Sequence, residues 1–161
     1  MTADILSPGK GRLGSRAVYV VDGARTPFLR ARGGPGPFRA SDLAVAAARA
    51  LLTRLGLDGD RLDQVLLGCV SSGPDEANIA RVVALRLGCS ERVPAWTVQR
   101  NCASGMQALD SAALEIASGR SDLVLAGGTE SMSHHPVLFN RLMVAWLGQW
   151  SQARSISARG R

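Results

Sequence analysis

Lysine and aromatic residues are scarce in this chain. Lys10 is the only lysine among 19 basic residues, and Phe, Trp and Tyr together make up 4% of the sequence. The arginines are scattered, so no basic stripe alternates with aromatic side chains as on nucleic-acid-binding surfaces. The sequence therefore predicts no nucleic-acid partner. Because arginine binds phosphate groups well, the net charge of +6 is compatible with an anionic small-molecule ligand.

Cysteine and histidine are also sparse. The sequence contains three cysteines, Cys69, Cys89 and Cys102, and two histidines, His134 and His135. The cysteine spacing matches neither a zinc site nor a Cys-x-x-Cys redox motif, so no metal site is predicted. An odd number of cysteines without a secretory signal is typical of a protein kept in a reducing compartment, and we expect a cytoplasmic location.

Long apolar runs are missing as well. The amphipathic stretch at residues 137–150 is too short to span a bilayer, so no membrane span is expected. Residues 1–16 lack the apolar segment of a secretory signal, and their basic residues and glycines predict a flexible basic tail. A mitochondrial presequence is the alternative for this tail, but Asp4 and the weak amphipathicity argue against it.

Short apolar runs alternate with helical patterns along the chain. We expect strands at residues 17–21, 65–70, 94–98 and 123–126. We expect helices at residues 41–56, 74–88 and 102–118, and an amphipathic helix within residues 137–150. Ser41 is the expected N-cap of the first helix. This alternation is typical of an α/β fold with a parallel sheet and right-handed crossovers, in which ligands bind outside the carboxyl ends of the strands.

Cys102 stands where one of these strands gives way to a helix. Polar residues separate Val98 from a small-residue helix, so Cys102 is expected at the helix N-terminus. Unpaired backbone N–H groups and the helix dipole favour an anion there. A thiol in that position loses its proton more readily, and the thiolate is nucleophilic, which indicates covalent catalysis on an acyl group. The alternative is a buried cysteine that acts as a small apolar residue, as we expect for Cys69 and Cys89.

The surroundings predicted for Cys102 are a sheet edge and a buried helix. Glu130 follows the strand that ends at Ala126, so its side chain and Cys102 are expected near the same edge of the sheet. The helix after Cys102 has small residues nearly all round, among them Ala108 and Ala112. This composition predicts a helix that is covered on both faces and lies between two sheets.

Three motifs of the chain resemble one protein family. Residues 101–109, with the sequence NCASGMQAL, resemble the nucleophile segment of the thiolases, the acetyl-CoA C-acyltransferase family. Residues 20–28 (VVDGARTPF) resemble the opening strand and turn of that family, and residues 127–133 (GGTESMS) resemble the strand end after the cysteine helix. Related ketosynthases share the fold and a cysteine at this point, but DGARTP at residues 22–27 favours a thiolase.

The resemblance implies a thiolase-like α/β fold and a reaction. Residues 17–133 would form the N-terminal βαβαβαβ half, and residues 134–161 would begin the loop insertion that helps to bind coenzyme A. Cys102 would be the nucleophile that carries the acyl group as a thioester, with its backbone N–H as an oxyanion donor. The reaction would be thiolytic cleavage of 3-ketoacyl-CoA or Claisen condensation of acyl-CoA. Coenzyme A would be a substrate or product, no cofactor would be bound permanently, and the family forms homodimers or homotetramers.

The other catalytic segments of the family do not occur in this sequence. In the family the base is a histidine in a Gly-His-Pro segment, a second cysteine lies in a Cys-x-Gly segment, and an Asn-Glu-Ala-Phe segment helps to hold a water. We expect His134 and His135 to make surface or loop contacts, since no glycine precedes His135-Pro136. We interpret the chain as the N-terminal half of a thiolase, cut within the loop insertion. The alternative to acyl transfer is a catalytically inactive fragment or a subunit that needs a separate C-terminal half.

Overall fold

A parallel three-stranded sheet forms the centre of the fold. The structure is a computed structural model that describes residues 16–152, so most of the expected basic tail lies outside the described residues. The described strands are β1 (Gln64–Gly68), β2 (Ala95–Val98) and β3 (Val124–Gly128), in the order β2-β1-β3. β1 is parallel to both neighbours, with Leu66 opposite Trp96 on one side and Ala126 on the other. The predicted α/β class with a parallel sheet is confirmed.

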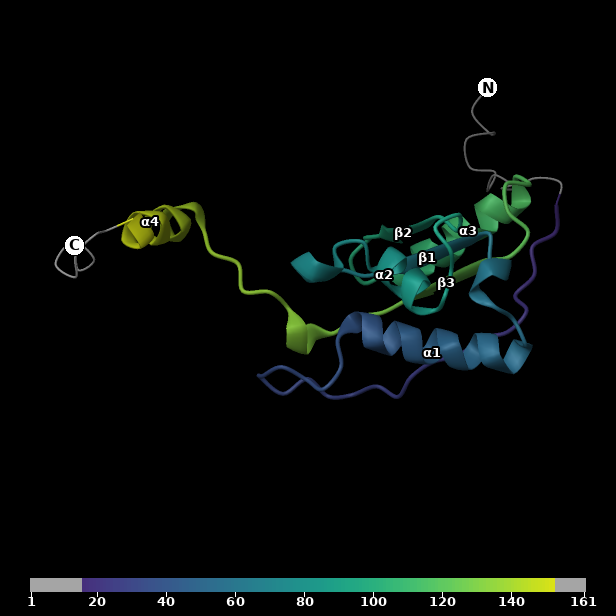
Figure 1. The fold of residues 1–161 in the computed structure, drawn as a ribbon, viewed down its shortest axis with the longest axis horizontal. Coiled ribbons are helices and arrows are strands. Elements are labelled where there is room, and N and C mark those ends of the chain that lie inside the picture. The colour runs from purple at the N-terminus through teal and green to yellow at the C-terminus, as the bar shows by residue number, and fades with distance from the viewer. Residues whose placement is uncertain (1–15, 153–161) are drawn as a thin grey trace, which may run out of the picture.

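Helices cover both faces of this sheet (Figure 1). They are α1 (Ala40–Leu55), α2 (Ile79–Arg86) and α3 (Ser104–Ala117), and the chain continues into α4 (Arg141–Gln152), with short 3-10 turns at Gly59–Arg61, Pro74–Glu76 and Met132–His134. The side chains of β1 alternate between the two faces. Val65 and Leu67 pack in the core with α1 and α2, whereas Leu66 packs with Ala108 and Ala112 of α3. One layer therefore consists of α1 and α2, and the opposite layer consists of α3.

The first helix is capped by a different residue from the one predicted. The N-cap of α1 is Arg39, whose backbone N–H donates a hydrogen bond of 2.9 Å to the Asp42 carboxylate. This N–H, and after it the Arg86 guanidinium, holds the pKa of Asp42 below its ordinary value. Ser41 is buried and donates a hydrogen bond to the Glu76 carboxylate. The prediction of Ser41 as the N-cap is therefore wrong, because its hydroxyl serves a residue distant in the sequence.

Residues 17–21 do not form the predicted first strand. Val20 and Val21 are 92% and 72% exposed, and no strand of the described sheet pairs with the segment. It runs along the outside of the fold (Figure 1), where the Asp22 carboxylate accepts hydrogen bonds of 2.8 and 2.9 Å from the Arg54 guanidinium. An apolar run becomes a strand only where a neighbouring strand takes up its backbone hydrogen bonds, and composition does not reveal that neighbour.

The predicted helix at residues 74–88 is split in two. Pro74–Glu76 forms a 3-10 turn, and α2 begins after Asn78. The Asn78 side chain accepts a hydrogen bond of 3.2 Å from the Arg81 backbone N–H. Asparagine is among the best N-cap residues, so a cap inside the predicted helix divides it.

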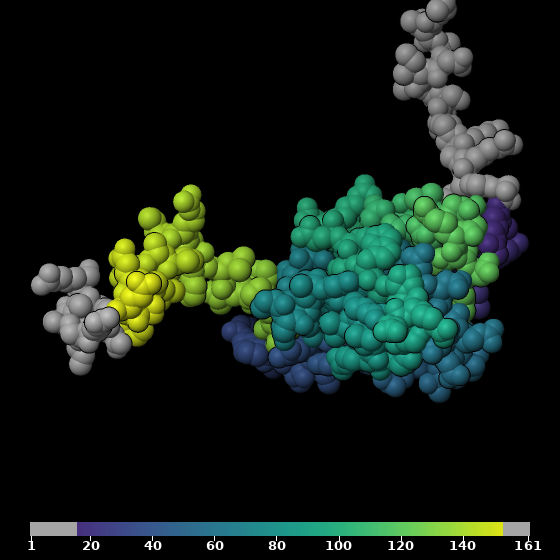
Figure 2. Space-filling model, turned by 45° about the horizontal axis from the view of Figure 1, so that its top comes forward, coloured from purple at the N-terminus to yellow at the C-terminus, as the bar shows by residue number. Residues whose placement is uncertain are grey.

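The helix predicted near the end of the chain is confirmed as α4. It follows an extended segment and lies apart from the sheet and its covering helices (Figures 1 and 2). None of its residues is buried, although Leu142, Trp146 and Leu147 are apolar. Within residues 16–152, no helix is both long enough and apolar enough to cross a membrane.

α3 is buried on one face and exposed on the other. Ala108 and Ala112 are buried against the sheet, whereas Met106, Leu109 and Leu114 are 69%, 47% and 48% exposed. We call these three residues the outer face of α3. The sequence predicts that other layers cover both faces of α3. Among the described residues, the sheet covers the face with Ala108 and Ala112, and the opposite face is exposed. The outer face has the apolar character of a surface that packs against another layer.

Candidate active site

A sharp turn joins β2 to α3 and contains Cys102. Asn101 in this turn has a φ of 48°, in the left-handed region, which asparagine adopts more readily than most residues. The buried Ser104 hydroxyl accepts a hydrogen bond of 2.8 Å from the Arg100 backbone N–H and donates one of 2.7 Å to the Asn101 carbonyl. The turn is therefore tied to the first residue of α3 and has a defined shape.

Cys102 lies beside the N-terminus of α3 and is exposed. The helix begins at Ser104 with Ala103 as its N-cap, two residues later than the sequence predicts. Cys102 is a free, exposed cysteine, so the alternative of a buried core cysteine is wrong for this position. That description holds instead for Cys69 and Cys89, which are 3% and 5% exposed, as predicted.

Three glycines let the start of α3 touch the backbone of the sheet. A Cβ atom added to Gly68, the last residue of β1, would lie 2.2 Å from the Ser104 carbonyl carbon. A Cβ atom added to Gly128, the last residue of β3, would lie 2.9 Å from the Gly105 Cα. Only glycine allows backbones to approach so closely. We call Gly68, Gly105 and Gly128 the glycine junction, which brings Cys102 to the carboxyl edge of the sheet.

Replacing Gly68 with alanine should destabilise the fold strongly. Forcing a methyl group into packed structure costs about 1–3 kcal/mol, and overlap with a backbone predicts a loss of about 3 kcal/mol in the free energy of unfolding. Urea denaturation followed by circular dichroism measures this loss. Gly23→Ala is the control, because a Cβ there meets no atom within 4 Å, and its effect should stay below about 0.5 kcal/mol. Equal effects of the two substitutions would contradict the close approach.

The Glu130 carboxylate lies at the same edge, as the sequence predicts, and bonds to the segment after β1. Its Oε2 accepts hydrogen bonds from the backbone N–H groups of Val70 and Ser71, at 2.8 and 3.3 Å. Its Oε1 lies 3.8 Å from the Cys69 Sγ. Burial, and after it the charge of Glu130, raises the pKa of the Cys69 thiol to about 11. Cys69 therefore stays protonated at neutral pH.

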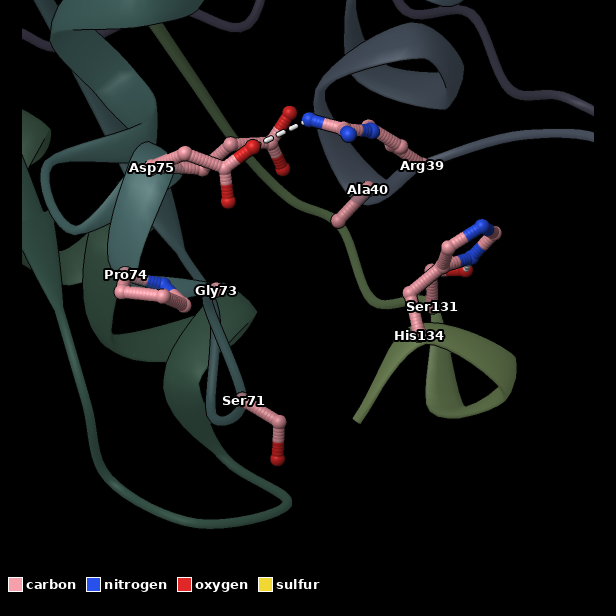
Figure 3. Close-up of a pocket in the computed structure, with 9 residues that line it drawn as sticks. Arg39, Ala40, Ser71, Gly73, Pro74, Asp75, Ser131 and His134 are labelled. Carbon is pink, nitrogen blue, oxygen red and sulfur yellow. Dashed lines mark hydrogen bonds and ion pairs between the residues drawn. The ribbon is translucent and has the colours of Figure 1, made fainter. Parts of the chain in front are cut away.

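A small pocket lies beside the start of α1 (Figure 3). It has a volume of about 130 Å³. Asp75 lies on one side and Arg39, Ser131 and His134 lie on the other, and the Arg39–Asp75 ion pair spans the pocket. The Ser131 hydroxyl lies 3.0 Å from the His134 Nδ1. Cys102 does not line this pocket, so the pocket is separate from the predicted nucleophile.

Neither histidine is hydrogen-bonded to Cys102 in the described part of the chain. His134 is half-buried and bonds to Ser131, and His135 is exposed, in agreement with the loop contacts predicted for both. The described residues also contain no group of three or more His, Cys, Asp and Glu side chains that could hold a metal ion. The candidate site consists of the Cys102 turn, the glycine junction and Glu130.

The family of the chain follows from its sequence match. A family model described as thiolase, N-terminal domain, matches residues 18–154. The chain belongs to the thiolase family, and its matched part is the N-terminal domain of that family. The predicted family is thereby confirmed, and residues 20–28, 101–109 and 127–133, which suggested it, all lie within the match.

The chain is similar in sequence to several enzymes. It is 44% identical over 129 residues to the beta-ketoadipyl-CoA thiolase of Pseudomonas knackmussii, a match that covers 79% of this chain and 32% of the relative. It is 38% identical over 144 residues to the mitochondrial trifunctional enzyme subunit beta of Bos taurus, which covers 89% of this chain and 30% of the relative. The chain thus spans about a third of the length of these relatives.

Solved structures of thiolases share the fold. The acetyl-CoA acetyltransferase of Bacillus anthracis matches with a TM-score of 0.62 and 40% identity, over 66% of this chain and 27% of that chain. The Acat5 thiolase of Ascaris suum, in complex with coenzyme A, matches with a TM-score of 0.61 and 28% identity, over 65% of this chain and 27% of that chain. The predicted thiolase-like fold is confirmed.

Proposed function

We propose that this chain is the nucleophile-bearing part of an acyl-CoA acyltransferase of the thiolase type, with Cys102 as the nucleophile. The observation that carries the proposal is the exposed position of Cys102 beside the N-terminus of α3, at the carboxyl edge of the sheet. Parallel α/β sheets bind their ligands at this edge. The relatives named as a thiolase and an acetyl-CoA acetyltransferase support the same class of reaction.

The proposed reaction begins when the Cys102 thiolate attacks the carbonyl carbon of an acyl-CoA thioester. The carbon–sulfur bond to coenzyme A breaks, coenzyme A leaves as a thiolate and takes up a proton, and the acyl group stays on Sγ as a thioester. In condensation, a second acyl-CoA that has lost its α-proton attacks the acyl carbon and releases Sγ. In thiolysis, Sγ attacks the 3-keto carbon of 3-ketoacyl-CoA, the departing acyl-CoA takes a proton on its α-carbon, and free coenzyme A removes the remaining acyl group.

Attack on the thioester places negative charge on the carbonyl oxygen, which needs hydrogen-bond donors. We assign one of these to the Cys102 backbone N–H. Loss of one oxyanion donor typically slows an acyl transfer about 100- to 1000-fold. The backbone N–H groups at the start of α3 add a positive partial charge beside the reacting carbon. The turn that precedes α3 thus combines nucleophile and donor in one short segment.

The proposed ligands are acyl-CoA thioesters, with coenzyme A as substrate or product and no permanently bound cofactor. The Ascaris suum thiolase of similar fold is described in complex with coenzyme A, which supports this class of ligand. We expect assembly as a homodimer or homotetramer, and residues 134–161 stay our prediction for the start of the coenzyme A-binding insertion. A cytoplasmic location suits the reaction, because it needs Cys102 as a free thiol.

A second candidate is a subunit that is inactive until a separate C-terminal half binds to it. The exposed outer face of α3 favours this candidate, since it offers an apolar surface to another layer. The bond of His134 to Ser131 instead of Cys102 favours it too. A C-terminal half would cover the helix and supply the base that takes the thiol proton.

Assays with acetoacetyl-CoA separate the two candidates. We expect no thiolytic cleavage by the chain alone above the rate in buffer, because the described residues hold no histidine at Cys102. Adding the separately expressed C-terminal half of a thiolase should start turnover, followed by the loss of acetoacetyl-CoA absorbance. Cleavage by the chain alone, abolished by Cys102→Ala, would show that no second half is needed. A mixture that neither turns over nor acetylates Cys102 would contradict the proposed function.

A further inference from the structure

The Glu130 carboxylate has no part in the reaction proposed above, although it lies at the same sheet edge as Cys102. Glu130 is half-buried. In the part of the chain that the structure describes, its carboxylate belongs to none of the ion pairs. Its charge is met instead by the backbone N–H groups of Val70 and Ser71 and by the nearby thiol of Cys69. These hydrogen bonds tie the segment after β1 to the Glu130 side chain.

The backbone that carries Glu130 is itself anchored. The Thr129 backbone N–H donates a hydrogen bond of 2.9 Å to the Gly68 carbonyl, and the Thr129 hydroxyl donates one of 2.6 Å to the Ala40 carbonyl. The Ser131 hydroxyl donates a bond of 2.9 Å to the Phe38 carbonyl. The residues on both sides of Glu130 are therefore bonded to β1 and to the start of α1. These bonds fix the position of the backbone that carries the carboxylate.

The segment that Glu130 holds is connected to the turn that contains Cys102. The Val70 carbonyl accepts a hydrogen bond of 3.5 Å from the Gln99 side-chain amide. The Cys69 backbone N–H donates a bond of 3.2 Å to the Val98 carbonyl. Val98 and Gln99 lead directly into the turn. Gln99 therefore bonds to the Val70–Ser71 peptide group, whose N–H also donates to the carboxylate.

We propose that Glu130 is a positioning residue for Cys102: it fixes the backbone after β1 and, through Gln99, keeps the Cys102 turn in the shape that presents the thiol at the start of α3. This role rests on the proposed function, which makes Cys102 the nucleophile. It depends on the acceptor oxygens of Glu130 and not on its charge.

The rate at which iodoacetamide alkylates Cys102 tests this role in the full-length chain. At neutral pH we expect Glu130→Ala to slow the alkylation of Cys102 about fivefold, as the thiol loses its favourable place at the helix N-terminus. Glu130→Gln should stay within about twofold of the unchanged chain, because its amide oxygen still accepts from Val70 and Ser71. Mass spectrometry of the tryptic peptides follows each cysteine separately.

The controls distinguish positioning from unfolding. Glu91→Ala, a change at an exposed glutamate outside this network, should leave the rate unchanged, and slow labelling of Cys89, which has no contact with Glu130, reports an intact core. If Glu130→Ala does not fold, Gln99→Ala removes the donor to the Val70 carbonyl and should slow Cys102 about threefold. The proposal is overturned if the folded variants react within about twofold of the unchanged chain, or if Glu130→Gln is as slow as Glu130→Ala. Alkylation needs no coenzyme A. The alkylation rates can therefore be interpreted even if the proposed acyl transfer does not occur.

Discussion

Cys102→Ala should abolish the transfer of an acetyl group from acetyl-CoA to this chain. Without Sγ no acyl-enzyme can form, and removal of a catalytic nucleophile typically lowers the rate at least about 1000-fold. The measurement is the acetylated fraction of the tryptic peptide that contains residue 102, with the C-terminal half of a thiolase present as the source of a base. Mass spectrometry of this peptide identifies the acetylated residue directly.

The control for this substitution is Cys89→Ala. Cys89 is buried and lies outside the Cys102 turn, so its removal should cost about 1 kcal/mol of stability and leave the acetylation of Cys102 in place. Acetylation of Cys102→Ala at the unchanged rate, or an acetyl group on another residue of the native chain, would contradict the assignment of Cys102 as nucleophile.

Iodoacetamide should modify Cys102 at least about 100-fold faster than Cys69 or Cys89 in the native chain. Alkylation requires an accessible thiolate, and Cys102 is exposed whereas the other two are buried. At pH 8 a thiol with a pKa of about 11, such as Cys69, is ionised to only about one part in 1000. Burial also raises the pKa of Cys89, with the charge of Asp60 contributing next. Raising the pH towards 11 should therefore increase the labelling of Cys69 before the fold is lost.

Labelling in urea provides the control for this selectivity. All three cysteines should then react at similar rates, because unfolding removes both the burial and the local charges. Equal labelling of the three in the native chain, with a circular dichroism spectrum that shows intact helices, would contradict the exposed position of Cys102.

The sequence predicts the elements of this fold where the signal is local. The apolar runs that became β1, β2 and β3 are bounded by glycine, proline or charged residues, and α1 ends at Gly56 with a φ of 63°. Residues 17–21 have the same composition but no pairing partner in the described sheet. Pairing depends on residues far away in the chain, and so does the bond between Ser41 and Glu76 that makes the predicted N-cap wrong.

In the candidate site, too, the sequence predicts the features that depend on local patterns and not the contacts between residues distant in the chain. The position of Cys102 beside a helix N-terminus follows from the change of pattern after Val98, and the order of strands and helices predicts Glu130 at the sheet edge. Its bonds to Val70 and Ser71 span about 60 residues of sequence, and no local pattern encodes them. Gly68 was open to prediction, since a glycine at the end of a buried strand marks a close backbone approach, but only the structure identifies its neighbour as Ser104.

The glycine junction also limits how far the proposed nucleophile drifts. Where Gly68 and Gly128 meet the start of α3, no rotating side chain separates the helix from the sheet, so thermal fluctuations carry these backbones together. In the proposed reaction, the thioester would then have to orient itself toward a sulfur whose backbone moves with the sheet. The small size of glycine is therefore what holds the Cys102 turn against the sheet, because an added methyl group would push the start of α3 away from β1 and β3.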